Sequence, residues 1–385
     1  MSVMNNNTIR TFAVVAHGAP LREVARPSRP LEGTEVMVKT TYAGLCHSDL
    51  HQIDGYFSLG GDDRLDLTVV KTLPFCVGHE IEGIVIAFGP DAKAETSVKM
   101  GDSCAVYPWC GCRKVNMCGE CAEGSEHLCT NFLDKRDIGN GMDMEGGFSS
   151  HVVVPHPSYL FPTAGLNMSP GLAGTYMCSG LTAYSALKKL GTPPNGAGDI
   201  LIIGLGGVGM QGFHMARALF GDYPLATDIR QEALDEVARL GGKCFNATEP
   251  KVHKSIKKAT ANFAGVYGVV DFVGNEKSFA LANRVVRRGG QIVVVGLLGG
   301  KIDMPLAMLT LKSTSIRGTL VGSLDECKEM FALIREGKIG EIPHETRSVR
   351  HINAAIQDLR DGRVVGRCLL KHDWEEWDAP RNASL

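Results

Sequence analysis

Two patterns of hydrophobic and polar residues divide the chain. Residues 8–175 contain short apolar and β-branched runs that Gly and Pro interrupt, for example 36–43 and 82–88. This pattern is typical of a compact, mainly antiparallel or barrel-like β domain. From about Leu181 onward, buried-strand runs alternate with segments of helical spacing. Such alternation predicts an α/β domain with a doubly wound parallel sheet.

The second pattern can be divided into elements. Strands are expected at four apolar runs, 199–204, 224–228, 268–273 and 291–296. Helices are expected between them at 211–220 and 231–240, and Gly241-Gly242 ends the second of these. Later in the chain, the pattern predicts a helix at 324–336 and a strand at 364–370 that could rejoin the first domain.

Composition narrows the function classes. With 385 residues, 44% of them apolar and 21% charged, the chain can form two domains with full cores. A net charge of −2 gives no electrostatic footprint for nucleic acid or an anionic membrane. No run of eighteen apolar residues predicts a membrane span, and the N-terminal residues do not resemble a signal peptide. We therefore expect a cytoplasmic protein.

A glycine-rich turn follows the predicted strand 199–204. Its residues are Gly204, Leu205, Gly206, Gly207, Val208 and Gly209, and Asp228 lies nineteen residues further on, at the end of the next strand. Glycines here let a dinucleotide pyrophosphate approach the helix N-terminus, and the acidic residue can bind the adenosine ribose. A carboxylate there favours NAD over NADP, although Arg230 weakens that preference. The alternative is a tight strand–helix turn without a ligand.

Three residues could hold a zinc ion and leave one coordination position open. Cys46 and His79 occur in the sequences Gly44-Leu45-Cys46-His47-Ser48-Asp49 and Gly78-His79-Glu80. Cys178, where the two patterns meet, is the third candidate. Three protein ligands with a free fourth position are typical of catalytic zinc. The alternative for Cys178 alone is a small buried hydrophobic residue.

Five of the twelve cysteines fall between Cys110 and Cys129. Cys112, Cys118, Cys121 and Cys129 have the spacing of a closed, four-thiolate structural zinc site. Cys110 could replace Cys112 as the first ligand. The alternative is reactive or disulfide-bonded thiols, which a cytosolic chain rarely contains. The sequence therefore predicts two zinc ions per chain, one catalytic and one structural.

Taken together, these motifs resemble the zinc-dependent alcohol dehydrogenases of the medium-chain dehydrogenase/reductase superfamily. The resemblance runs from about Thr11 to Leu370, with the motifs in the family's order. It implies a GroES-like catalytic domain formed by residues 1–179 and 321–385. It also implies a Rossmann domain for NAD at 180–320.

The resemblance assigns roles around the metal. Cys46, His79 and Cys178 would hold the catalytic zinc. Asp49 would orient the His79 ring. Glu80 would lie behind the metal and approach it during ligand exchange.

The resemblance also implies a proton relay and cofactor contacts. Ser48 would hydrogen-bond the substrate oxygen and His51 would pass its proton to solvent. His47 and Arg367 would face the NAD pyrophosphate, and Thr182 would pack near the nicotinamide. Without the resemblance, His47 and Ser48 could belong to a solvated loop, and His51 could be a surface histidine.

Two segments depart from the family's usual pattern. The first two cysteines of the thiol cluster are usually separated by two residues, and here five residues separate Cys112 from Cys118. The segment 54–64 is longer than in many members. Similar loops occur in bacterial members that act on medium-chain alcohols and ω-hydroxy acids. We expect this loop to border the substrate entrance.

The sequence thus predicts an NAD-dependent alcohol dehydrogenase that interconverts an alcohol with an aldehyde or ketone, as a homodimer or homotetramer. A polyol dehydrogenase and an ω-hydroxy-acid dehydrogenase are related alternatives. A zinc-free quinone or enoyl reductase and a zinc-stabilised binding module are less favoured, because each leaves several motifs without a role. Zinc content separates them: two ions for the dehydrogenase, one for the module and none for the reductase.

Overall fold

The contacts within the chain divide it into two compact units. The computed structural model describes residues 8–92, 98–131, 134–139 and 144–374. The first unit comprises Met1–Tyr56, Asp66–Cys178 and Pro343–Leu385. The second comprises Phe57–Leu65 and Ser179–Ile342.

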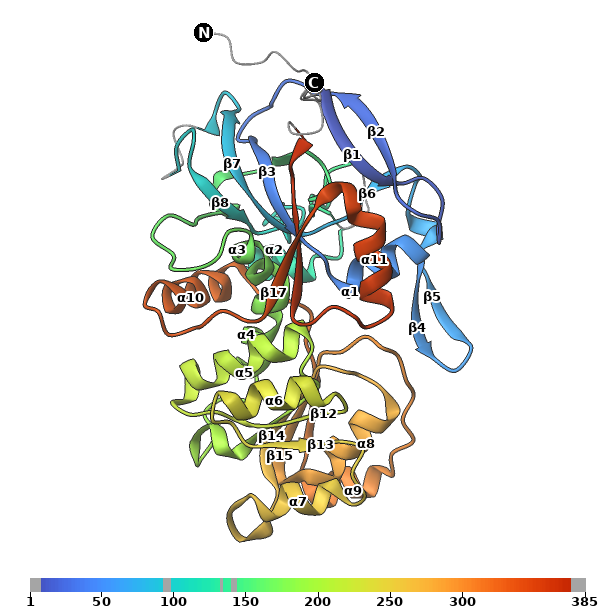
Figure 1. The fold of residues 1–385 in the computed structure, drawn as a ribbon, viewed down its shortest axis with the longest axis vertical. Helices are drawn as coiled ribbons and strands as arrows, with labels where there is room; N and C mark the ends of the chain where they lie inside the picture. The colour runs from blue at the N-terminus through green and yellow to red at the C-terminus, as the bar shows by residue number, and fades with distance from the viewer. Residues whose placement is uncertain (1–7, 93–97, 132–133, 140–143, 375–385) are drawn as a thin grey trace, which may run out of the picture. The chain divides into compact units, whose positions relative to one another are not determined.

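The first unit is mainly β (Figure 1). Its strands are β1 (Thr8–Val14), β2 (Arg22–Pro27), β3 (Val36–Gly44), β6 (Phe75–Cys76), β7 (Glu80–Phe88), β8 (Ser103–Val106), β9 (His151–Val154), β10 (Leu160–Pro162), β17 (His344–Ser348) and β18 (Arg367–Lys371). Its helices are α1 (His47–Asp54), α2 (Gly119–Ala122), α3 (Leu172–Thr175) and α11 (Ile352–Arg360).

The described residues of the first unit form two sheets. One has the order β10-β8-β7-β3-β18-β17, with β9 also paired to β3, and the other has the order β2-β1-β6. Pairing is antiparallel except between β17 and β18. β18 pairs with β3 through Leu369 and Gly44, which confirms the predicted return of the C-terminal strand.

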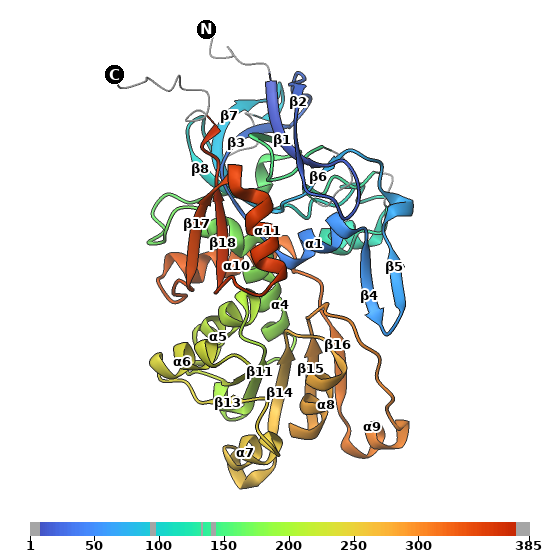
Figure 2. The same cartoon turned by 45° about the vertical axis from the view of Figure 1, so that its right-hand side comes forward.

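Helix α11 is placed by its apolar periodicity. Ile352, Ala355, Ile356 and Leu359 follow helical spacing, and all four are buried in one hydrophobic core. Leu50 belongs to the same core, so α11 packs behind α1. Figure 2 shows α11 beside β17 and β18. The C-terminal segment therefore supports the helix that carries several predicted site residues.

The second unit alternates strands and helices. Its strands are β11 (Ile200–Ile203), β12 (Leu225–Asp228), β13 (Cys244–Asn246), β14 (Val266–Asp271), β15 (Val286–Val294) and β16 (Ser315–Gly318). Its helices are α4 (Leu181–Lys188), α5 (Gly207–Phe220), α6 (Gln231–Arg239), α7 (Val252–Lys258), α8 (Glu276–Val285), α9 (Leu306–Lys312) and α10 (Leu324–Arg335).

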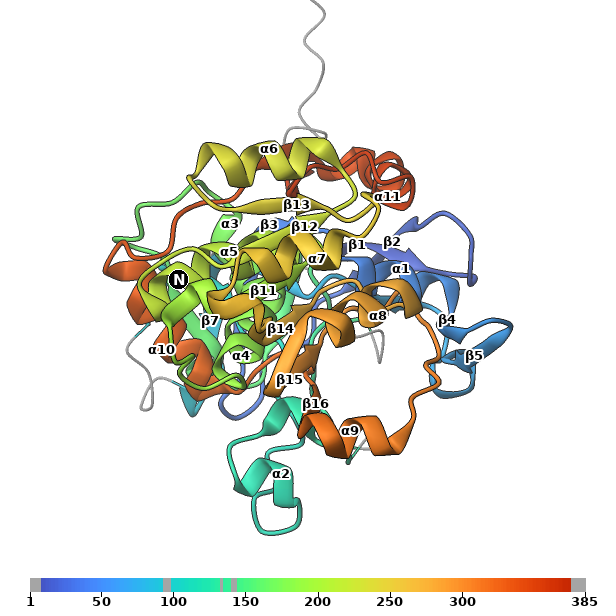
Figure 3. The same cartoon turned by 90° about the horizontal axis from the view of Figure 1, so that it is seen from below.

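All six strands pair in parallel in the order β13-β12-β11-β14-β15-β16. Strand order reverses between β11 and β14. Right-handed crossovers in opposite directions place α5 and α8 on opposite faces of the sheet, as Figure 3 shows. This doubly wound Rossmann sheet confirms the predicted fold class, and its switch point is where such sheets bind ligands.

The contacts assign residues 321–342 differently from the sequence prediction, which grouped them with the catalytic domain. Helix α10 packs against α4 within the second unit. Tyr184 Oη donates to Glu329 at 3.0 Å, and Lys188 forms an ion pair with the same carboxylate. Hydrophobic periodicity alone predicts that α10 exists, but not which helix it contacts.

Strands β4 (Tyr56–Gly60) and β5 (Asp63–Asp66) form a separate two-stranded sheet. This hairpin occupies most of the segment that departs from the family pattern. Its residues Phe57–Leu65 belong by contacts to the second unit, although the chain on either side belongs to the first. Among the described residues, no helix is long and apolar enough to cross a membrane.

Candidate active site

The structure brings Cys46, His79 and Cys178 together in the first unit. Their ligand atoms all lie within 4.8 Å of one another and the three residues are buried. His79 Nε2 lies 3.2 Å from Cys178 Sγ. Cys46 precedes α1 and His79 precedes β7, while Cys178 lies in a π-helical turn, Tyr176–Gly180. Two thiols and one imidazole form the donor set of an open zinc site.

Asp49 connects two of the three ligand-bearing segments. Its carboxylate accepts hydrogen bonds from the backbone N–H of Cys46 at 2.9 Å and of Gly78 at 3.1 Å. His79 Nδ1 lies 3.1 Å from the same carboxylate. A carboxylate on the far ring nitrogen leaves Nε2 free to face the thiols. The structure thus places Asp49 where the sequence expected it to orient His79.

Trp109 also contributes to this site. Its ring lies 5.4 Å from the His79 ring, between centroids. Its indole Nε1 donates to the carbonyl of Met177 at 2.9 Å. Trp109 therefore limits rotation of His79 and fixes the turn that carries Cys178.

Charges in this cluster favour metal binding. A hydrogen bond with Cys178 lowers the pKa of the Cys46 thiol well below its usual value, and that same contact raises the pKa of Cys178. Burial opposes protonation of His79, but the charge and hydrogen bond of Asp49, together with the contacts of Cys46, outweigh burial and raise the pKa of the imidazole. One thiolate is therefore already favoured without a metal, and a cation of charge +2 would stabilise the second.

Glu80 lies beside the cluster in a buried ion pair with Arg367. Burial raises the pKa of Glu80 to about 7, although the positive charge of Arg367 opposes this. The carboxylate's Oε1 is buried and has no hydrogen-bond partner among the described residues. A free acceptor next to three soft ligands fits a cation site. Sequence reasoning expected Arg367 at the cofactor pyrophosphate and did not foresee that it pairs with Glu80.

Helix α1 presents the residues of the predicted proton relay. Ser48 is partly buried, and His51 follows three positions later on the same helical face. Burial, together with the charge of His47 four positions before it, lowers the pKa of His51. The imidazole is therefore neutral at pH 7 and can accept a proton. His47 itself is exposed.

The second thiol cluster contains Cys112, Cys118, Cys121 and Cys129. Their four sulfur atoms lie within 4.8 Å of one another, and all four residues are buried. Cys110 is outside this group, because its thiol donates to the carbonyl of Tyr107 at 3.6 Å. The geometry therefore favours Cys112 over Cys110. Four thiols leave no open position, as in a structural zinc site.

In the second unit, the glycine-rich turn lies at the carboxyl end of β11, before α5. Gly204 has a φ of +88°, which favours glycine. A Cβ atom on Gly209 would lie 1.8 Å from the Gly204 carbonyl oxygen, so this position in the first turn of α5 accepts only glycine. A Cβ on Gly206 would meet no atom within 4 Å. The open space beside the amide groups that begin α5 fits a pyrophosphate. Gly207 and Val208 form the first turn of α5.

Asp228 ends β12 next to this turn and is 7% exposed. Its carboxylate accepts hydrogen bonds from the backbone N–H of Leu205 at 2.6 Å and of Arg230 at 2.9 Å. The Arg230 side chain forms an ion pair with it at 3.3 Å. Asp228 thus supports the glycine turn while standing at the carboxyl edge of the sheet. Thr182 lies in the first turn of α4 and is partly buried.

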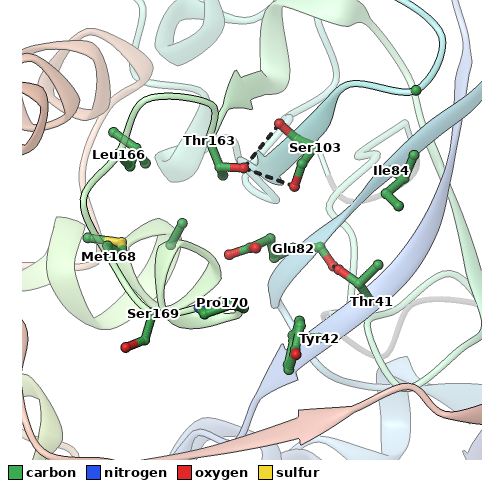
Figure 4. A pocket seen from close by; sticks show the side chains of 12 residues that line it. Thr41, Tyr42, Glu82, Ile84, Ser103, Thr163, Leu166, Met168, Ser169 and Pro170 are labelled. Carbon is green, nitrogen blue, oxygen red and sulfur yellow. Dashed lines mark hydrogen bonds between the residues drawn. The ribbon is translucent and has the colours of Figure 1, made fainter.

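A cavity of about 380 Å³ lies elsewhere in the first unit (Figure 4). Its lining includes Glu82, Tyr42, Leu166 and Met168 but none of the predicted site residues. The Glu82 carboxylate accepts a hydrogen bond from the backbone N–H of Gly171 at 3.1 Å. That contact gives Glu82 a structural role before α3, and the cavity is not part of the candidate site.

The combination of a GroES-like β unit, a Rossmann unit and an open thiolate–imidazole cluster defines a zinc-type medium-chain dehydrogenase/reductase. Residues 32–164 match the family model of the alcohol dehydrogenase GroES-like domain, and residues 207–336 match that of the zinc-binding dehydrogenases. The NAD-dependent alcohol dehydrogenase of Sulfurisphaera tokodaii is 30% identical over 364 residues, 94% of this chain and 99% of that protein. The chain therefore belongs to the zinc-dependent alcohol dehydrogenase family.

Other similar proteins support the same family assignment. An alcohol dehydrogenase of Geobacillus stearothermophilus is 31% identical over 355 residues, 91% of this chain and 95% of that protein. A crystal structure of an NAD-dependent alcohol dehydrogenase matches with a TM-score of 0.80 at 24% identity, covering 94% of this chain and 99% of that one. Acetophenone reductase from Geotrichum candidum, solved with NAD, matches with a TM-score of 0.78 at 24% identity, covering 96% and 99%. These structures share the fold.

Proposed function

We propose that this protein oxidises a small alcohol to an aldehyde or ketone with NAD, and that the reaction is reversible. The observation that carries the proposal is the buried cluster of Cys46, His79 and Cys178 in a chain that also contains an NAD-type glycine turn. When bound, zinc supplies a Lewis acid that lowers the pKa of an alcohol, and NAD supplies the hydride acceptor.

The donor set suits an uncharged substrate. With zinc bound, Cys46 and Cys178 would be thiolates and His79 a neutral imidazole, and this ligand charge of −2 would offset the charge of Zn²⁺. The neighbouring Glu80–Arg367 pair is also neutral overall when Glu80 is ionised. A buried site without net charge avoids the large cost of an uncompensated buried ion. Such a site can accommodate an alcohol and, after oxidation, release a neutral carbonyl compound.

Ser48 and His51 remove the proton of the alcohol in this proposal. The Ser48 hydroxyl is at the first turn of α1, next to the ligand Cys46, and would accept the substrate proton as it donates its own. Burial lowers the pKa of His51, so its imidazole is neutral before the reaction and would readily release to solvent a proton received from Ser48. His51 is partly exposed, as the last member of a relay should be.

Asp228 would select NAD over NADP. The carboxylate lies at the end of β12, where a Rossmann sheet binds the adenosine ribose. A 2′-phosphate would be repelled by it. Arg230 is the nearby cation, and its ion pair with Asp228 reduces its availability to a phosphate. We assign His47 and Arg367 to the pyrophosphate and Thr182 to the nicotinamide as further parts of this proposal.

The four-thiol cluster would hold a second, structural zinc. Cys112, Cys118, Cys121 and Cys129 lie around the short helix α2, in a segment with little regular structure. Metal binding to such a segment contributes folding free energy directly. We therefore propose two zinc ions per chain.

We also propose that the protein is a homo-oligomer built on a dimer. Strand β16 is at the edge of the parallel sheet, and all four of its residues are exposed. Leu306 and Leu311 of the adjacent α9 are 77% and 67% exposed. An exposed edge strand beside apolar side chains is a site for pairing with a second copy. Sedimentation of the protein, alone and as Ile316→Lys, tests this: the variant should be monomeric.

One experiment tests the catalytic proposal. Purified protein is analysed for zinc and assayed for NAD reduction with primary, secondary, aromatic, polyol and ω-hydroxy-acid alcohols. We expect two zinc ions per chain and turnover of at least one class, and the preferred class decides between the related dehydrogenases. Cys46→Ser should lose one zinc ion and nearly all turnover while the protein stays folded. Full turnover in a Cys46→Ser protein that lacks this metal would refute the proposal.

A further inference from the structure

The hairpin β4–β5 makes an unusually close backbone contact within the second unit. A Cβ atom placed on Gly60 would lie 2.8 Å from Gly300 Cα, and one placed on Gly299 would lie 2.6 Å from the Ser58 carbonyl oxygen. Gly60 is buried. Distances this short are not tolerated by a real Cβ atom, so the two backbones can lie this close only with glycine at both positions. The hairpin therefore packs main chain against main chain on the segment that follows β15.

A second, weaker contact joins the same two segments. Lys301 Nζ forms an ion pair with Asp63 of the hairpin. Both side chains are more than half exposed, so this pair contributes little energy by itself. The Lys301 backbone N–H also donates to Glu276 Oε1 at 3.0 Å, at the start of α8. The glycine segment is thus held between the hairpin and α8.

The segment that the hairpin contacts lies at the carboxyl edge of the sheet. Its backbone is bonded to the loop after β14: Val295 N donates to Asp271 O at 2.9 Å, and Gly299 N donates to Gly274 O at 3.1 Å. Rossmann sheets bind dinucleotides outside this edge, one mononucleotide on each side of the switch point. Asp228 marks the β11–β12 side for the adenosine half. The loops after β14 and β15 therefore face the nicotinamide half.

We propose that the hairpin is a positioning element for the nicotinamide half of NAD. It holds residues 295–301 in the conformation that the cofactor requires, and NAD binding in turn stabilises the docked hairpin. The inference rests on NAD as the cofactor. The reciprocity follows from linkage: if docking strengthens NAD binding, NAD strengthens docking by the same factor.

Adjacent glycines provide a matched pair of variants. Gly60→Ala places a methyl group against the Gly300 backbone, whereas Gly61→Ala places one where no atom lies within 4 Å. Both glycines have positive φ, +97° for Gly60 and +60° for Gly61. Because the backbone conformation at Gly60 is more strained for alanine than that at Gly61, a third variant removes the hairpin without this strain. In it, residues 57–65 are replaced by Asn-Gly. The hydrogen bond from Leu67 N to Gly55 O, 2.8 Å long, already closes the base of the hairpin.

Fluorescence titration measures the Kd of NADH for each variant. The Kd of AMP is measured for comparison, because AMP fills only the adenosine half of the NAD site. We expect Gly60→Ala and the excised variant to bind NADH about ten-fold more weakly, a typical coupling. AMP binding and zinc content should be unchanged in both, and Gly61→Ala should match the unmodified protein. In the unmodified protein, NADH should slow hydrogen exchange in residues 57–65.

Three results would overturn the inference. Equal losses of AMP and NADH affinity would mean general damage to the second unit. Unchanged NADH affinity in both variants would mean that the hairpin has no effect on the cofactor. Hydrogen exchange in residues 57–65 that NADH does not alter would exclude linkage. A protein that binds no NADH before any substitution would instead refute the proposed cofactor, which separates the two failures.

Discussion

Asp49→Asn is the substitution that most directly tests how the catalytic cluster is held. The carboxylate is fully buried and accepts from Cys46 N and Gly78 N, while His79 Nδ1 lies 3.1 Å from it. Asparagine keeps one of the two oxygens. Its better orientation places that oxygen toward Gly78 and His79, and turns the NH₂ group toward the Cys46 N–H. One buried donor then loses its acceptor.

The magnitude follows from that geometry. A buried donor without a partner costs about 1–3 kcal/mol, so the free energy of unfolding should fall by about that amount. Loss of the charged partner of a ligating histidine typically weakens metal binding by about 10- to 100-fold. On the free-energy scale this is about 1.4–2.8 kcal/mol, since about 1.4 kcal/mol corresponds to ten-fold. Both effects have the same origin, because Asp49 orders the ligand segments in the protein with and without metal.

Competition with a chromogenic chelator measures zinc affinity, and urea unfolding measures stability. Asp54→Asn is the matched control, since it is the same substitution in the same helix, at a carboxylate that pairs with Arg360 instead. We expect the control to keep both zinc ions. The comparison concerns the weaker-binding of the two zinc ions. If its affinity is the same in Asp49→Asn as in the Asp54→Asn control, the positioning role of Asp49 is refuted.

Three further predictions follow from the site. Asp228→Gly should weaken NAD binding and improve the use of NADP, which shifts the ratio of kcat/KM for the two cofactors. An unchanged ratio would mean that Asp228 does not face the ribose. Ser48→Ala should lower turnover by roughly 10²–10⁴-fold, and more than His51→Gln, which small basic buffers should partly rescue; the opposite order of losses would reverse the relay. Cys112→Ser should release one zinc ion and lower thermal stability while Cys110→Ser does neither, and zinc analysis with thermal melting shows whether they differ.

The parts of the site that short motifs encode could be predicted from the sequence. Cys46 and Asp49 lie three positions apart, so the turn that begins α1 also brings the Asp49 carboxylate to the Cys46 backbone N–H. The glycine turn and Asp228 are similarly local to two adjacent strands. In such cases the spacing along the chain nearly determines the spacing in the fold. The same alternation of elements predicted β11, β12, β14 and β15, whereas β13, β16 and the strand order are seen only in the structure.

Some contacts between distant segments could not be predicted from the sequence. Arg367 and Glu80 are 287 positions apart, and their ion pair depends on β18 and β7 lying on either side of β3. The contact of Gly60 with Gly300 is similarly remote. Neither residue has a side chain, so no hydrophobic or charge pattern could indicate it. The expectation that the segment 54–64 borders the substrate entrance remains a prediction, and the structure adds its contact with the segment after β15.

The choice between Cys110 and Cys112 shows why spacing alone was insufficient. Both thiols precede the irregular gap, and either number of intervening residues can form a loop. The backbone decides, because Cys110 is directed toward the Tyr107 carbonyl, and Tyr159 Oη donates to the Cys110 carbonyl at 3.0 Å. Burial also raises the pKa of the Cys110 thiol well above its usual value, which disfavours the thiolate that zinc requires.

The two thiol clusters differ in what surrounds them. This difference distinguishes a catalytic metal site from a structural one. Around Cys112 and its partners the fourth position is filled by a thiol, so a bound ion could only stabilise the loop. Among the described residues, no further thiol or imidazole joins Cys46, His79 and Cys178 as a fourth ligand. Instead, Glu80 and Trp109 adjoin the cluster, and neither belongs to the group of ligands. A zinc ion held by these three buried ligands would keep one coordination position open. A substrate oxygen could bind there, and Asp49 would keep the ligands in place.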